Sequence, residues 1–82
     1  MTNIREIEIS AIDSEARIIL ESLHREMERL KAINANSDDE DEAADAGNDC
    51  LEVSSLYNKV KETAVSTFGS QITNFSNEYI KF

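Results

Sequence analysis

The sequence predicts an all-α protein, an antiparallel helical hairpin of residues about 10–34 and 38–68 followed by a short C-terminal helical segment. Three observations carry this prediction. Apolar residues recur at gaps of three and four through both ranges, which is the spacing of one helix face. Each range begins with residues that typically cap a helix N-terminus. The 82-residue chain has no proline, and its only glycines are at 47 and 69.

Residues 1–9 form the first element, an N-terminal arm. Apolar and charged residues alternate from Arg5 to Ile9, as in a strand, although Ile4 and Ile7 also suit a helical lead-in. We therefore expect this arm to be extended or weakly ordered. It lacks the basic region and long apolar core of a secretory signal. Together with the single cysteine of the chain, this favours a cytoplasmic protein.

The first predicted helix, 10–34, has one apolar stripe and one charged face. Ser10 and Asp13 are a candidate capping box at its start. Asn34 and Asn36 are candidates for the C-terminal cap and turn, because asparagine tolerates left-handed backbone. The stripe comprises Ile12, Ala16, Ile19, Leu20, Leu23, Met27, Leu30 and Ile33, and the opposite face carries Asp13, Arg17, Glu21, Arg25 and Arg29.

Residues 36–52 contain eight acidic residues and no base, so they hold nearly all of the formal net charge of −9. This strongly acidic segment fits either a disordered linker or the start of the second helix. Ser37 and Glu40 form a capping box, and carboxylates are favoured in a first helical turn. The apolar positions Ala43, Ala46, Cys50, Val53, Tyr57, Val60, Ala64 and Phe68 continue through the segment without a break, so helix is the preferred interpretation. Gly47 opposes it by about 1 kcal/mol relative to alanine.

Gly69 is a natural stop for the second helix. Ser70 is placed to cap a last short helix, although the spacing of the aromatic residues would also allow the second helix to continue. Two helices cannot enclose a core alone, so either the C-terminal aromatic residues fold back or a second copy covers the hairpin. We expect a single domain, 1–82, completed as a bundle by homo-oligomerisation, most simply a four-helix dimer. The predicted self-association residues are Ile18, Leu51, Val65, Phe75, Tyr79 and Phe82.

An acidic face is the most distinctive feature of the second helix. Its residues are Asp38, Glu42, Asp45, Asp49 and Glu52, at gaps of 4, 3, 4 and 3. Such a stripe fits a solvated helix face or a docking surface for a basic protein. The negative net charge argues against direct binding of nucleic acid through its phosphates and against docking on an anionic membrane. No apolar run approaches the ~18 residues of a membrane span.

A divalent cation site is the alternative interpretation of the same carboxylates, with Glu42, Asp45 and Asp49 as ligands for Mg²⁺. The element Glu42-Ala-Ala-Asp45 resembles the acidic E-x-x-D element of the all-helical nucleotide pyrophosphohydrolases of the MazG type. That resemblance implies a magnesium-dependent nucleotide hydrolase. In that family a preceding helix supplies an E-x-x-E pair. This chain departs from the pattern, because Glu21 is followed three residues later by His24.

The remaining reactive residues point away from enzymatic chemistry. His24 flanks the first apolar stripe without a nucleophile at a useful spacing, and Cys50 lies on the second stripe as a small apolar residue. The sequence has no glycine-rich phosphate loop and no pair of zinc ligands. We therefore expect no required cofactor and a non-enzymatic protein-interaction module, a small regulator or inhibitor. A purely structural self-assembling subunit and the magnesium-dependent hydrolase are the alternatives.

Overall fold

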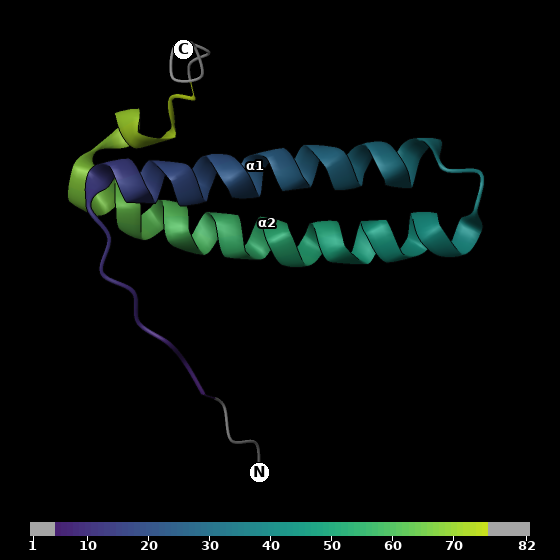
Figure 1. Ribbon diagram of the computed structural model, residues 1–82, viewed down its shortest axis with the longest axis horizontal. Helices are drawn as coiled ribbons and strands as arrows, with labels where there is room; N and C mark the ends of the chain where they lie inside the picture. Colours follow the sequence, from purple (N-terminus) through teal and green to yellow (C-terminus); the bar gives the residue numbers. More distant parts are fainter. Residues whose placement is uncertain (1–4, 76–82) are drawn as a thin grey trace.

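The computed structural model describes residues 5–75 and confirms the all-helical hairpin. Helix α1 spans Asp13–Asn36, helix α2 spans Glu40–Phe68, and a 3-10 helix, η1, spans Ser70–Thr73. Figure 1 shows α1 and α2 side by side and antiparallel, joined by residues 37–39. Within residues 5–75 there is no strand.

Helix α1 begins three residues later than the sequence predicts, and the proposed Ser10–Asp13 capping box is wrong. The backbone is still extended at Ile12, and the first helical hydrogen bond runs from Ala16 N to Ile12 O at 2.9 Å. The carboxylate of Glu15 accepts from Ile12 N at 3.0 Å, which is the half of a capping box that needs no polar cap side chain. Acidic side chains in the first turn therefore satisfy this end of the helix.

Helix α2 begins at Glu40, and its N-cap is Asp39 and not the predicted Ser37. Oδ1 of Asp39 accepts from Asp41 N at 2.9 Å and from Glu42 N at 3.3 Å. An aspartate in this position satisfies two backbone donors and also places a negative charge at the positive end of the helix. The acidic segment is therefore helical from Glu40 onwards, as the apolar spacing indicates.

The connection between the helices needs no left-handed residue. Among residues 5–75 only a glycine has a positive φ. The prediction that Asn34 and Asn36 cap the helix and form the turn in left-handed conformation is therefore wrong. Both asparagines lie inside α1. Ser37 N donates to Ile33 O at 2.9 Å and closes the last turn, while its backbone is already extended. Three residues are thus enough to reverse the chain.

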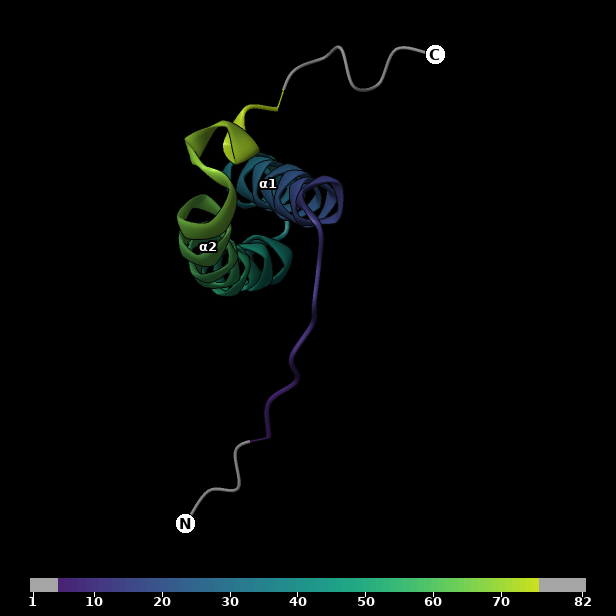
Figure 2. The same ribbon diagram turned by 90° about the vertical axis from the view of Figure 1, so that its left-hand side faces the viewer.

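Gly69 ends α2 as predicted. Its φ of 99° and ψ of 165° lie in a region that essentially only glycine occupies, and its N–H donates to Val65 O at 2.9 Å. The chain then turns into η1, which packs against both helices, so α2 does not continue through the C-terminal residues. Figure 2 shows η1 on one side of the hairpin and the N-terminal arm on the other.

The main core lies at the open end of the hairpin, where α1 begins and α2 ends. Ile72 of η1 is only 1% exposed and Leu20 of α1 is 0% exposed. Ala16 and Ala64 complete this buried cluster, with Tyr57, Val60, Val65, Phe68 and Phe75 packed around it. Among the C-terminal aromatic residues the predicted fold-back is confirmed for Phe75, and Ile72, which was not predicted to be buried, supplies core that two helices lack.

The other end of the hairpin is held by small residues and one polar contact. Leu30 and Ala46 are buried there. Nδ2 of Asn34 donates across the hairpin to Ala43 O at 2.7 Å. A Cβ placed on Gly47 would lie 2.8 Å from that Nδ2 atom. Gly47 therefore gives the Asn34 amide the space to reach α2, which explains a glycine that the helix propensity alone disfavours.

No helix among the described residues is long and apolar enough to cross a membrane.

Candidate acidic interaction face

The acidic face begins in a small hydrogen-bonded network at the start of α2. The Ser37 hydroxyl donates to Oε1 of Glu42 at 2.6 Å, and it accepts from Asp39 N at 3.1 Å. Glu42 is therefore tied to the connection, and its own backbone N–H is capped by Asp39. Consecutive carboxylates are tolerated at this point because the N-terminus of a helix carries a partial positive charge.

Four residues of the acidic face, Glu42, Asp45, Asp49 and Glu52, lie in α2, and all four side chains are exposed. Asp38 is exposed as well, but it lies in the connection before the helix. Neighbouring members are three or four residues apart, which places them about 5–6 Å apart on a helix surface. The fold thus presents a row of carboxylates to solvent on a regular helical support.

Leu56 extends the acidic face and was not among the predicted site residues. It follows Glu52 by four residues and Asp49 by seven, so it continues the same line along α2. Its side chain is 47% exposed. The row of carboxylates therefore ends on an apolar side chain. The sequence could have indicated this position, because Leu56 follows Glu52 by the same gap of four that separates members of the acidic face.

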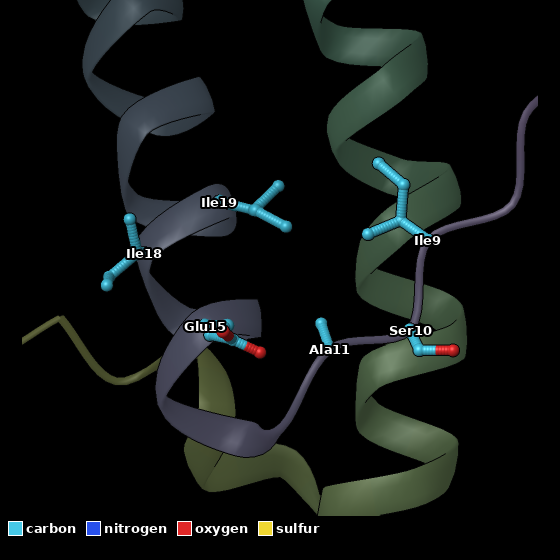
Figure 3. A pocket seen from close by; sticks show the side chains of 6 residues that line it. All are labelled: Ile9, Ser10, Ala11, Glu15, Ile18 and Ile19. Carbon is cyan, nitrogen blue, oxygen red and sulfur yellow. The ribbon is translucent and has the colours of Figure 1, made fainter.

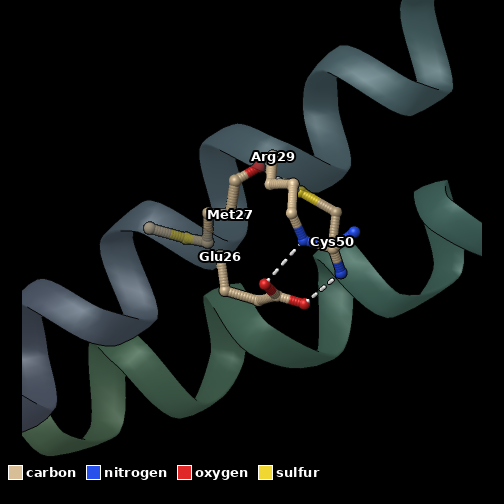
Figure 4. A network of polar contacts seen from close by, with 4 residues as sticks. All are labelled: Glu26, Met27, Arg29 and Cys50. Carbon is tan, nitrogen blue, oxygen red and sulfur yellow. Dashed lines mark hydrogen bonds and ion pairs between the residues drawn. The ribbon is translucent and has the colours of Figure 1, made fainter.

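An ion pair on α1 borders the acidic face. Figure 4 shows the carboxylate of Glu26 facing the guanidinium of Arg29 in a two-point contact, with Nε to Oε1 at 2.9 Å and Nη2 to Oε2 at 2.7 Å. The hydrogen bond to Arg29 holds the pKa of Glu26 below its ordinary value. The pKa of Arg29 is raised, chiefly by Glu26 and to a smaller extent by the charge of Asp49. On the charged face of α1, Glu21 pairs with Arg25 at 2.7 Å.

The alternative magnesium site has no preformed cluster in the described residues. Within residues 5–75 no group of three or more His, Cys, Asp or Glu side chains is arranged to hold a metal ion. Of the three alternative ligands Glu42, Asp45 and Asp49, the first already accepts the Ser37 hydroxyl. Magnesium binding by these residues stays an untested alternative.

His24 and Cys50 both take part in packing between elements. The His24 ring is half-buried between Tyr57 of α2 and Phe75, with ring centroids 6.2 and 5.5 Å away. The histidine thus connects α1, α2 and the segment after η1. The half-buried Cys50 thiol donates to Met27 O at 3.8 Å across the hairpin (Figure 4), which agrees with its predicted position on the apolar stripe.

The predicted self-association residues that the structure describes differ in exposure. Ile18 on α1 and Leu51 on α2 are 64% and 72% exposed. Val65 and Phe75 are half-buried and pack in part against the core cluster of the same chain. Tyr79 and Phe82 lie outside the described residues.

An apolar groove beside the start of α1 was not predicted. Figure 3 shows the side chain of Ile9, on the arm, and that of Ile19, on α1, facing one another. Ile18 lies at the rim and points away from Ile19. The groove is lined by Ile9, Ser10, Ala11, Glu15, Ile18 and Ile19. Only the path of the arm reveals it, because no periodic pattern joins an extended segment to a helix.

Comparison with protein-family models, curated proteins and solved structures gave no match for this chain.

Proposed function

We propose that this chain is a non-enzymatic interaction module that self-associates and presents its acidic face to a basic protein, as a small regulator or inhibitor does. The observation that supports this most directly is the exposure of every member of the acidic face, four of which lie on a helix whose first turn is fixed by hydrogen bonds. Carboxylates held on a rigid helix lose little freedom when a partner binds.

The charge distribution supports a basic partner. Residues 36–52 carry eight acidic residues and no base, so the electrostatic field is strongest along one part of the molecule. Such a field speeds the encounter with a positively charged surface and excludes partners of like charge. The exposed Leu56 at the end of the acidic face adds apolar contact to a surface that would otherwise be only charged.

A pair of charge-matched variants tests the acidic face. Asp45→Asn with Glu52→Gln removes two charges from it, and Glu28→Gln with Glu62→Gln removes two exposed charges elsewhere. Tagged chains are used to capture proteins from a lysate of the source cell, and recovered proteins are identified by mass spectrometry. A basic protein retained by the wild type and the control, but lost with the first variant, is the expected result.

Three results would contradict the acidic-face hypothesis. If both double variants lose the basic protein to the same extent, only the net charge matters. If both retain it as well as the wild type does, the acidic face is not the docking surface. Recovery of the chain itself and nothing else would favour the structural alternative, a self-assembling subunit. Self-association is measured separately, by light scattering after size exclusion, and a monomer at every concentration would remove that part of the proposal.

A further inference from the structure

The described part of the arm, residues 5–9, has the sequence pattern of a half-buried segment but is not buried by any residue of 5–75. Ile7 and Ile9 share one side of an extended backbone, and Glu6 and Glu8 share the other. Such alternation is typical of a segment with one covered side. Ile7 is nevertheless 83% exposed and Ile9 is 70% exposed.

The exposed apolar surface of the hairpin is concentrated beside the arm. Ile12, just before α1, and Ile18, on its outer side, are each 64% exposed. With Ile7 and Ile9 they place four of the most exposed large apolar side chains within a 12-residue stretch, 7–18. Their combined exposed apolar area is on the order of a few hundred Å², comparable to the largest apolar patch of a typical monomer, which is often functional.

The chain cannot cover this patch with its own arm. Ile9 already forms one wall of the apolar groove, with Ile18 and Ile19 of α1 on the other side. From there towards Arg5 the arm runs away from both helices (Figures 1 and 2). Ile7 therefore lies beyond the groove, and among residues 5–75 the groove is left open.

We infer that a second copy of this chain fills the groove by an exchange of Ile7, in which each arm stays beside its own α1 and Ile7 of each copy packs between Ile9 and Ile19 of the other, next to Ile18. This inference specifies the self-association in the proposed function and rests on it. The groove and the segment that fits it belong to the same molecule, so a twofold axis satisfies both copies at once. Because each copy contributes the same apolar side chains, the total area buried on the two copies approaches the roughly 1,200 Å² of a small specific interface.

The position of the charges also favours a second copy at this end. The eight acidic residues of 36–52 surround the connection and the first half of α2, at the opposite end of the hairpin from the arm (Figure 1). Two copies that meet through their arms therefore keep their acidic faces apart. Contact near the acidic face would instead bring like charges together, which opposes association.

Variants of the full chain separate this surface from other routes to a dimer. Ile7→Glu and Ile18→Glu each place a charge in the exchanged interface, and Leu51→Glu makes the same change at an exposed apolar site outside it. Association is measured by sedimentation equilibrium. We expect the dimer dissociation constant to rise roughly a hundredfold in the first two variants and to stay unchanged in the third. Circular dichroism should show unchanged helix content, because all three side chains are exposed.

Cross-linking tests the exchange itself. In a Cys50→Ser background, a chain with Ile7→Cys is mixed with a chain carrying Ile18→Cys, and oxidation is followed on a non-reducing gel. A disulfide-linked heterodimer is expected, while replacing the second chain by one with Leu51→Cys should give none. A dimer that survives both glutamate variants of the interface, or that dissociates only with Leu51→Glu, would overturn the exchange of Ile7 but keep self-association. A wild type that is monomeric at all concentrations would remove both.

Discussion

The contact between Asn34, Ala43 and Gly47 gives the sharpest test of how the two helices are held together. An alanine at position 47 would place its Cβ 2.8 Å from Nδ2 of Asn34. That atom is the end of a flexible side chain, so the amide would move away and lose its 2.7 Å hydrogen bond to Ala43 O. Gly47→Ala therefore combines two opposing effects.

The two effects are similar in size. Replacing a glycine inside a helix by alanine stabilises by about 0.8–1.0 kcal/mol. Loss of the Asn34 hydrogen bond costs about 0.5–1.5 kcal/mol. In the wild-type background we therefore expect Gly47→Ala to change the free energy of unfolding by only a few tenths of a kcal/mol. In an Asn34→Ala background nothing is displaced, and the same substitution should stabilise by close to 1 kcal/mol.

Urea unfolding followed by circular dichroism measures all four members of this double-mutant cycle at one protein concentration. The expected coupling between the two positions is about 0.5–1.5 kcal/mol. Asn48→Ala, an exposed change next to Gly47, replaces Gly47→Ala in a control cycle that should be additive. If Gly47→Ala stabilises equally in both backgrounds, a glycine at position 47 is not needed to make room for the Asn34 amide.

The remaining predictions concern the open end of the hairpin, the ion pair and the metal. Gly69→Ala should destabilise by about 1–3 kcal/mol in thermal unfolding, because a φ of 99° strains any residue with a Cβ; an unchanged melting temperature would show that α2 ends differently. Ile72→Ala should lower the free energy of unfolding by about 2–4 kcal/mol, because the Ile72 side chain is only 1% exposed. Leu51→Ala should stay within about 0.5 kcal/mol of wild type, because Leu51 is 72% exposed. Equal losses of stability in the two variants would show that η1 does not pack back on the hairpin. The pKa of Glu26 is lowered by Arg29, so its contribution to stability is complete above the ordinary carboxylate pKa and is lost as the pH falls through the lowered value. Titration by nuclear magnetic resonance should show that shift, and Arg29→Gln should abolish it; a normal pKa with Arg29 in place would refute the pair. Millimolar Mg²⁺ should raise the melting temperature no more than NaCl of equal ionic strength; a larger rise that Asp45→Ala removes would support the magnesium alternative.

The sequence alone determines the two helices and the faces they bury. Apolar gaps of three and four continue through the acidic segment, and helix formation follows because periodic burial outweighs the repulsion among carboxylates that mostly face water. The end of the second helix at Gly69 was also predictable, because a glycine directly after the last apolar residue of α2 can take the positive φ found there. All five predicted residues of the acidic face are exposed, although Asp38 lies in the connection and not in α2; their role in partner binding stays a prediction.

The ends of the helices were less predictable. Ser10 and Ser37 both head a plausible capping box, yet Glu15 and Asp39 provide the hydrogen bonds that form. Several acidic and hydroxyl side chains lie near each helix N-terminus, and which of them forms the capping hydrogen bond depends on the direction in which the preceding chain enters the helix. A local pattern does not contain that direction.

Contacts between elements were decided by the tertiary structure. Asn34 meets Ala43 and Gly47 only because the three-residue connection sets the two helices in one register. His24 lies between Tyr57 and Phe75 only because η1 folds back over the hairpin. The apolar groove exists only because the arm passes α1 as it enters the helix. Helical periodicity states which side of each helix is apolar, but the partner of each side chain depends on how elements distant in sequence are placed against one another.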